Sequence, residues 1–135
     1  MSPVVRTVPT NVSVTEAAKA MAKWKIGSLV ILRGKKPVGI ITEGDVSKCV
    51  AKGLDPSKTT VAYQKKKLVT IRPEERLELA AKIMASASVK KLPVMDGKEL
   101  VGILTQTDIV NSSFELVTSL KEMVRTRYRP PDFEP

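Results

Sequence analysis

Two pairs of a threonine and an aspartate are the side chains of this sequence whose types and spacing could do chemistry together. Thr42 precedes Asp45 by three residues, and Thr105 precedes Asp108 by the same spacing. Each pair belongs to a heptapeptide that begins with glycine and two aliphatic residues. At the start of a helix, a hydroxyl and a carboxylate with this spacing accept hydrogen bonds from free backbone N–H groups. The pattern therefore predicts a helix start in both places.

These two pairs could serve the helices alone, or they could also hold a ligand. As caps, they would stabilise each helix by about 1 kcal/mol without any ligand. Capping does not explain the glycine that stands three residues before each threonine. A helix N-terminus also attracts anions such as phosphate, and a carboxylate beside it can accept hydrogen bonds from a ribose diol. We therefore expect both pairs to cap a helix and to bind a ligand with sugar hydroxyls.

The two heptapeptides are parts of a longer internal duplication. Residues 4–48 align with residues 67–111 without a gap, at a constant offset of 63 positions, and identical pairs such as Met21 and Met84 recur along the alignment. A repeat of this kind indicates one supersecondary unit that is used twice. Each copy is too short to bury a sizeable core alone, so we expect the copies to pack on each other.

Periodicity and turn residues predict the elements that position the first pair. The Ser13 and Glu16 side chains form a capping-box pattern, and Gly53 is typical of a helix end. The expected order is a brief strand, a helix, two strands joined by a turn, and a second helix. These elements are predicted at residues 4–5, 14–24, 29–32, 37–42 and 43–52.

The second copy is predicted to repeat this order. Pro73 favours the start of its first helix, because the missing N–H has no partner in a first turn. Residues 61–65 between the copies are expected to form a short helical turn, and apolar spacing extends the last helix from Gln106 towards Arg127. The three strands are predicted at residues 68–72, 92–95 and 99–105. Each copy is thus β-α-β-β-α, and the fold class is α+β.

The composition excludes several kinds of site. The chain has 135 residues, no histidine and one cysteine, so neither an intramolecular disulfide nor a zinc site of cysteine and histidine is expected. No nucleophile with a base, P-loop or dinucleotide motif is present, and we expect no enzymatic activity. No apolar run approaches the ~20 residues of a membrane span. No secretory leader is present, and a cytoplasmic location is expected.

The net charge of +9 favours anionic partners such as phosphates, nucleic acid or an acidic protein. The same charge also fits a solvated surface of lysines, and both interpretations stay open. Nucleic acid is the weaker candidate, because aromatic residues for base stacking make up only 4% of the chain and no nucleic-acid-binding motif occurs.

The paired motifs resemble those of the cystathionine-β-synthase (CBS) domain family. The residues that carry the resemblance are 39–45, 90–97 and 102–108, and it covers nearly the whole chain up to Ser113. It implies two CBS repeats packed about a pseudo-twofold axis, with two clefts between them. We therefore expect repeats at residues 1–53 and 67–113, a linker at 54–66, and a C-terminal helix and tail at 114–135.

The resemblance also implies a non-catalytic regulatory module of the energy-sensing kind. Its ligand would contain adenosine, as AMP, ADP or ATP, with S-adenosylmethionine or nucleic acid as alternatives. A homodimer is implied, and a separate effector protein would read the bound state unless the module acts alone. Such a readout needs a ligand that binds two states of the module with different affinities.

Ligand-binding roles follow from the same resemblance. The aspartate of each motif would bind ribose hydroxyls, the threonine would bind ribose or phosphate, and Ile40 and Ile103 would contact the base. Each cleft would draw on both repeats. The residues expected at the first cleft are Ile40, Thr42, Asp45, Lys66, Val89, Lys90 and Lys91. Those expected at the second cleft are Pro3, Val4, Ile26, Gly27, Ser28, Ile103, Thr105 and Asp108.

The two clefts would differ in charge. Lys90 and Lys91 would neutralise phosphates in the first cleft, whereas Gly27 and Ser28 stand at the corresponding positions of the second. We therefore expect the cleft of Thr42 and Asp45 to bind the more phosphorylated ligand. The other interpretation is that the two lysines belong to the solvated surface.

Overall fold

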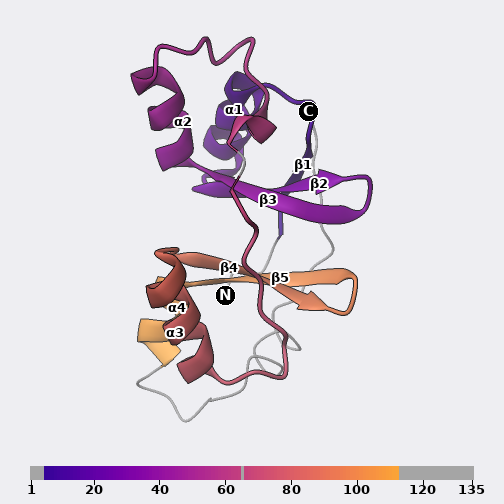
Figure 1. The fold of residues 1–135 in the computed structure, drawn as a ribbon, viewed down its shortest axis with the longest axis vertical. Helices are drawn as coiled ribbons and strands as arrows, with labels where there is room; N and C mark the ends of the chain where they lie inside the picture. Colours follow the sequence, from indigo (N-terminus) through magenta and orange to yellow (C-terminus); the bar gives the residue numbers. More distant parts are fainter. Residues whose placement is uncertain (1–4, 65, 113–135) are drawn as a thin grey trace. The chain divides into compact units, whose positions relative to one another are not determined.

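The structure is a computed structural model and describes residues 5–64 and 66–112. These residues fall into two compact units. Arg6–Leu68 form the first unit, and Val5 with residues 69–112 forms the second unit. Strands and helices alternate in both units (Figure 1). The fold class is therefore α+β, as predicted.

The first unit is built on a three-stranded sheet in the order β1-β2-β3. β1 pairs with β2 in parallel, and β2 pairs with β3 antiparallel. Two helices cover one face of this sheet, and a 3-10 turn follows them (Figure 1). The elements are β1 (Thr7–Pro9), α1 (Val14–Trp24), β2 (Ser28–Arg33), β3 (Lys36–Thr42), α2 (Glu43–Ala51) and η1 (Val61–Tyr63).

The core of the first unit is aliphatic and lies between the sheet and the two helices. Leu29 and Ile41 from the sheet are almost fully buried, and α1 contributes Val14 and Met21 at helical spacing. The lone cysteine, Cys49, is fully buried on α2 and packs as a small apolar residue. The core therefore consists mainly of aliphatic side chains, as expected for a chain with few aromatic residues.

The second unit is built on a two-stranded sheet in the order β4-β5, with α3 and α4 on one face (Figure 1). A turn at Gly97 joins the strands, and its φ of +62° is a conformation that glycine adopts readily. The elements are α3 (Leu77–Ala87), β4 (Lys91–Asp96), β5 (Glu99–Thr105) and α4 (Gln106–Ser112). Its core includes Leu92 and Leu104, both fully buried.

The backbone repeats between the two units in detail. α1 ends at Lys25 and α3 ends at Ser88, and both residues have a left-handed conformation with φ of 54°. Such a conformation is uncommon for residues other than glycine. Because the two residues are 63 positions apart, the sequence duplication corresponds to a duplicated backbone.

Several predicted boundaries are wrong. α3 begins at Leu77 rather than at Pro73, which lies in a turn before the helix. The strand predicted at residues 68–72 is reduced to one bridge between Ile71 and Val94. The first strand lies at Thr7–Pro9 rather than at residues 4–5, where Val4 is outside the described residues.

Two further observations bear on the predicted ends and spans. The predicted extension of the last helix past Ser112 lies outside the described residues. Among the helices that the structure describes, none has the length and apolar character to cross a membrane.

Candidate functional site

In the first unit, Thr42 and Asp45 form a reciprocal cap at the start of α2. The Thr42 hydroxyl accepts a hydrogen bond from the Asp45 N–H at 3.2 Å, and Asp45 Oδ2 accepts one from the Thr42 N–H at 2.9 Å. Asp45 is 2% exposed. The predicted cap is confirmed. It engages one oxygen of a carboxylate that is almost completely removed from water.

The second carboxylate oxygen is bound by Lys66, which follows η1 in the segment between the repeats. Lys66 Nζ donates to Asp45 Oδ1 at 2.8 Å. The lysine side chain is half exposed, so the buried negative charge is balanced by a cation that water still reaches. The structure thus places Lys66 beside the Thr42–Asp45 cap, and its role towards a ligand stays a prediction.

Tyr63 fixes the same segment to the same helix end. Its hydroxyl donates to the backbone carbonyl of Asp45 at 2.8 Å. Burial raises the pKa of the Tyr63 hydroxyl above its ordinary value, with smaller contributions from Cys49 and Asp45. The phenol therefore keeps its proton and remains a donor well above neutral pH. Tyr63 and Lys66 together hold the end of the linker against the start of α2.

A cavity of about 210 Å³ is lined by the sheet and by this linker segment. Val38, Gly39 and Ile40 contribute from β3, and Ala62, Gln64 and Lys66 contribute from the linker. Pockets for small molecules usually measure ~300–1,000 Å³. The cavity is therefore large enough for part of a nucleotide, such as a base, but not for the whole of one.

The second unit repeats the cap with different surroundings. Asp108 Oδ2 accepts from the Thr105 N–H at 2.9 Å, and the Thr105 hydroxyl accepts from the Asp108 N–H at 3.1 Å. Asp108 is partly exposed, whereas Asp45 is buried. At the duplication offset, the residue that corresponds to Lys66 is Pro3. The two caps therefore have the same backbone geometry. The lysine beside the first cap is, however, replaced by a proline at the corresponding sequence position of the other repeat.

Gly27 and Ser28 lie beside the cap of their own unit. Ser28 pairs with Thr42 across β2 and β3, and the Gly27 carbonyl accepts from the N–H of Glu43 at 3.1 Å. Ile26 precedes them directly after the left-handed end of α1, and its N–H donates to Met21. These residues thus lie next to the first turn of α2.

Lys90 and Lys91 take the equivalent place in the second unit. Lys91 pairs with Thr105 across β4 and β5, and the Lys90 carbonyl accepts from the N–H of Gln106 at 2.9 Å. The Lys90 side chain is exposed, and the preceding Val89 is partly buried against the core. Two lysines are therefore present next to the Thr105 cap at the positions that Gly27 and Ser28 occupy beside Thr42.

The other predicted ligand-binding residues are neither confirmed nor contradicted by the structure. A cleft in which Lys90 and Lys91 face Asp45 requires residues from both repeats, and that arrangement stays a prediction. Pro3 and Val4 lie outside the described residues. Ile103 is buried on β5. Within the described part of the chain, no group of three or more histidine, cysteine or acidic side chains is placed to hold a metal ion.

Four residues that the structure places at this cap and cavity are not among the residues predicted from the sequence: Tyr63, Val38, Ala62 and Gln64. Val38 could have been found, because β3 alternates and Val38 is two residues before Ile40 on the same face. The linker residues gave no comparable signal. Their place beside β3 depends on the path of an irregular segment.

The sequence matches the CBS domain twice, over residues 1–52 and 62–115. The chain belongs to the CBS domain family. This CBS pair is similar to the uncharacterized protein MK0525 of Methanopyrus kandleri. The two are 33% identical over 121 residues, and the alignment covers 87% of this chain. The chain spans 61% of the length of that relative.

Solved CBS proteins have the same fold as this CBS pair. The CBS-domain containing protein ATU1752 from Agrobacterium tumefaciens is 29% identical with a TM-score of 0.74, covering 81% of this chain and 89% of that one. The CBS domain pair of protein MJ0100 is 31% identical with a TM-score of 0.73, covering 82% and 88%. That pair was solved in complex with 5′-methylthioadenosine and S-adenosyl-L-methionine.

Proposed function

We propose that this CBS pair is a non-catalytic regulatory module that binds an adenosine ligand at its two Thr–Asp caps. The observation that carries the proposal is the Thr42–Asp45 cap, which shares Lys66 with a cavity that Ile40 also lines. The adenosine compounds in the MJ0100 pair support the ligand class. The proposed repeats are residues 1–53 and 67–113, with the linker between them.

The chemistry of the cap suits a nucleoside. Asp45 Oδ2 is held by the Thr42 N–H, so Oδ1 is the oxygen through which the carboxylate would accept from a ribose hydroxyl. Ile40 would contact the base, and the Thr42 hydroxyl and the helix end would face the ribose or a phosphate. In the second unit, Ile103, Thr105 and Asp108 would take the same roles.

The charges favour AMP, ADP or ATP over S-adenosylmethionine. Lys66, Lys90 and Lys91 are cations at or near the caps, and the whole chain carries +9. A phosphate gains from such surroundings, whereas the sulfonium of S-adenosylmethionine is repelled. The further residues proposed for the two clefts are Val89 at the first, and Pro3, Val4, Ile26, Gly27 and Ser28 at the second.

A bound ligand would act by favouring one of two states of the module, as a homodimer or towards a separate effector protein. The linker is the element through which this would occur, since Tyr63 and Lys66 join it to the cap. No catalytic step is part of the proposal.

The test compares two variants that each remove one capping carboxylate. Asp45→Asn alters the proposed site, whereas Glu16→Gln alters the equivalent N3 carboxylate of the capping box on α1, away from the cavity. Isothermal titration with AMP, ATP, 5′-methylthioadenosine and S-adenosylmethionine gives the affinities. Asp45→Asn is expected to weaken binding at least tenfold, about 1.4 kcal/mol, and Glu16→Gln is expected to leave it unchanged.

Circular dichroism of both variants checks that each one is folded. The proposal fails if the folded wild-type protein binds none of the four compounds with a Kd below about 1 mM. It also fails if the two variants bind the ligand equally well.

A further inference from the structure

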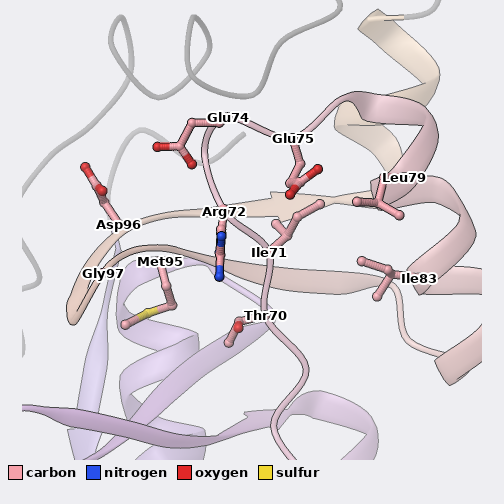
Figure 2. A pocket seen from close by; sticks show the side chains of 10 residues that line it. All are labelled: Thr70, Ile71, Arg72, Glu74, Glu75, Leu79, Ile83, Met95, Asp96 and Gly97. Atoms are coloured by element: carbon pink, nitrogen blue, oxygen red, sulfur yellow. The ribbon is translucent and has the colours of Figure 1, made fainter.

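A groove of about 740 Å³ lies open on the second unit, between α3, the loop before it and the β4–β5 turn (Figure 2). Ile71, Leu79, Ile83 and Met95 give it an apolar lining. Leu79 is 39% exposed and belongs to the few large apolar side chains of the described residues that water reaches so freely. This groove is separate from the Thr105–Asp108 cap, which contributes no residue to its lining.

In the first unit, the corresponding place is filled by the linker. Val61 is 3% exposed, and its N–H donates to the Val12 carbonyl at 2.9 Å. The carbonyls of Thr59 and Pro56 accept from the N–H groups of the first two residues of α1, at 2.8 and 3.1 Å. The chain that follows the last helix of the first repeat therefore covers this face and caps α1.

The corresponding surface of the second unit is more apolar, so covering it would stabilise that unit more. Leu79 and Ile83 stand where the first repeat has Glu16 and Ala20, so the exposed surface is more apolar. The N-cap of α3 is Arg76, whose side chain makes no capping hydrogen bond. Apolar surface and the N–H groups of a first helical turn are both stabilised when another segment covers them.

We propose that residues 116–127 of the same chain occupy this groove. Leu116, Leu120 and Val124 are spaced by four residues and would share one face of the helix that this apolar spacing predicts. Val124 is also the residue that corresponds to Val61 at the duplication offset of 63 positions. The chain that follows the last helix of the second repeat thus carries apolar residues where the first repeat uses its linker.

The charges of the groove and of this segment are complementary. Three acidic residues, Glu74, Glu75 and Asp96, and one cation, Arg72, line the groove, so its charged side chains are acidic on balance. The segment carries Lys121, Arg125 and Arg127 but one acidic residue, Glu122. Complementary charge fixes the orientation of a docked segment more than it adds affinity. The C-terminal segment is therefore an integral part of the second repeat.

Disulfide trapping in the full-length chain tests the contact directly. Leu79→Cys and Val124→Cys are combined with Cys49→Ala, so that only two thiols remain. Oxidised glutathione takes up two electrons and two protons as the sulfur atoms join. An intramolecular disulfide is expected, seen as a monomer in a non-reducing gel and a mass lower by about 2 Da. In the control, Phe133→Cys replaces Val124→Cys, and the bond should form at least ten times more slowly.

Hydrogen exchange supplies a second readout without engineered thiols. Val124→Asp places a charge on the apolar stripe, whereas Thr118→Asp places one on the opposite face of the same helix. Val124→Asp is expected to speed amide exchange at the start of α3 about tenfold, and Thr118→Asp is expected to leave it unchanged.

Two results would overturn the proposal. One is equal trapping rates for the Val124 and Phe133 cysteines together with unchanged exchange in Val124→Asp. The other is a disulfide that links two chains, because a second copy would then fill the groove.

Discussion

Asp45 combines three demands that rarely fall on one side chain. It caps α2 through Oδ2, it accepts from Lys66 through Oδ1, and it is 2% exposed. A buried carboxylate is tolerated only when hydrogen bonds and a counter-charge replace water. The lysine that supplies this charge comes from the linker, so the stability of the cap depends on a residue outside its own repeat.

Lys66→Ala is expected to lower the free energy of unfolding, because it leaves the buried Asp45 carboxylate without its cation. The expected loss is only about 1 kcal/mol, because the Lys66 side chain is half exposed and water screens the ion pair. Urea unfolding followed by the fluorescence of Trp24, the only tryptophan, measures this in the first unit. In an Asp45→Asn background, the same lysine substitution should cost less than half as much. Equal costs in the two backgrounds would show that the ion pair contributes nothing to stability.

Residue identity and spacing alone predicted the Thr42–Asp45 cap. Thr42 and Asp45 were found because a cap and a ligand site use the same spacing, and the structure confirms the cap. Tyr63 was not found, because its hydrogen bond to the Asp45 carbonyl joins residues 18 positions apart. No local pattern encodes a contact that depends on where an irregular linker returns to its repeat.

At the scale of elements, local signals differ in strength between the two copies. The bounds of α1 follow from the sequence, because a capping box starts the helix and its apolar spacing continues to Trp24. The start of α3 was misplaced, because Pro73 suits both a first helical turn and a β-turn. The duplication itself contained the correction, since Leu77 corresponds to Val14, where α1 begins.

The β4–β5 hairpin makes a prediction at this scale. Gly97 has a φ of +62°, and a Cβ there would meet nothing within 4 Å, so the cost of Gly97→Ala is purely conformational. A loss of about 1–2 kcal/mol is expected in the unfolding free energy, measured by urea denaturation. Gly44→Ala, in the first turn of α2, is the control, and it should be neutral or slightly stabilising. Equal effects at the two glycines would contradict this account of the turn.

At the scale of the whole molecule, the duplication and the α+β class could be predicted from the sequence. The duplication follows from the repeat at a constant offset, and the class follows from the alternating strand and helix patterns within each copy. The offset of 63 positions recurs in the caps, in the left-handed residues Lys25 and Ser88, and in the two hairpins. The clefts proposed between the repeats could not be derived in the same way, because such clefts depend on how two folded units face each other, which no single motif specifies.

The proposed first cleft is tested by Lys90→Ala/Lys91→Ala. If these lysines meet the phosphates of a ligand held by Asp45, the double variant should bind ATP at least tenfold more weakly, about 1.4 kcal/mol, and adenosine almost unchanged. Lys35→Ala/Lys36→Ala removes the same charge from the exposed β2–β3 turn and the exposed first residue of β3, and it is the control. Calorimetric titration compares the four affinities. Full ATP affinity in the Lys90 and Lys91 variant would exclude this role.

The bond between Lys66 and Asp45 Oδ1 also bears on how a message could leave the ligand site. In the proposed complex, a sugar hydroxyl on this oxygen would share it with the ammonium group or compete with it, because a carboxylate oxygen has two lone pairs. Binding of the proposed ligand would then weaken the contact that holds Lys66, at one end of the linker, against the start of α2. One carboxylate would then both bind the ligand and hold the linker, so that ligand binding and linker position would depend on each other.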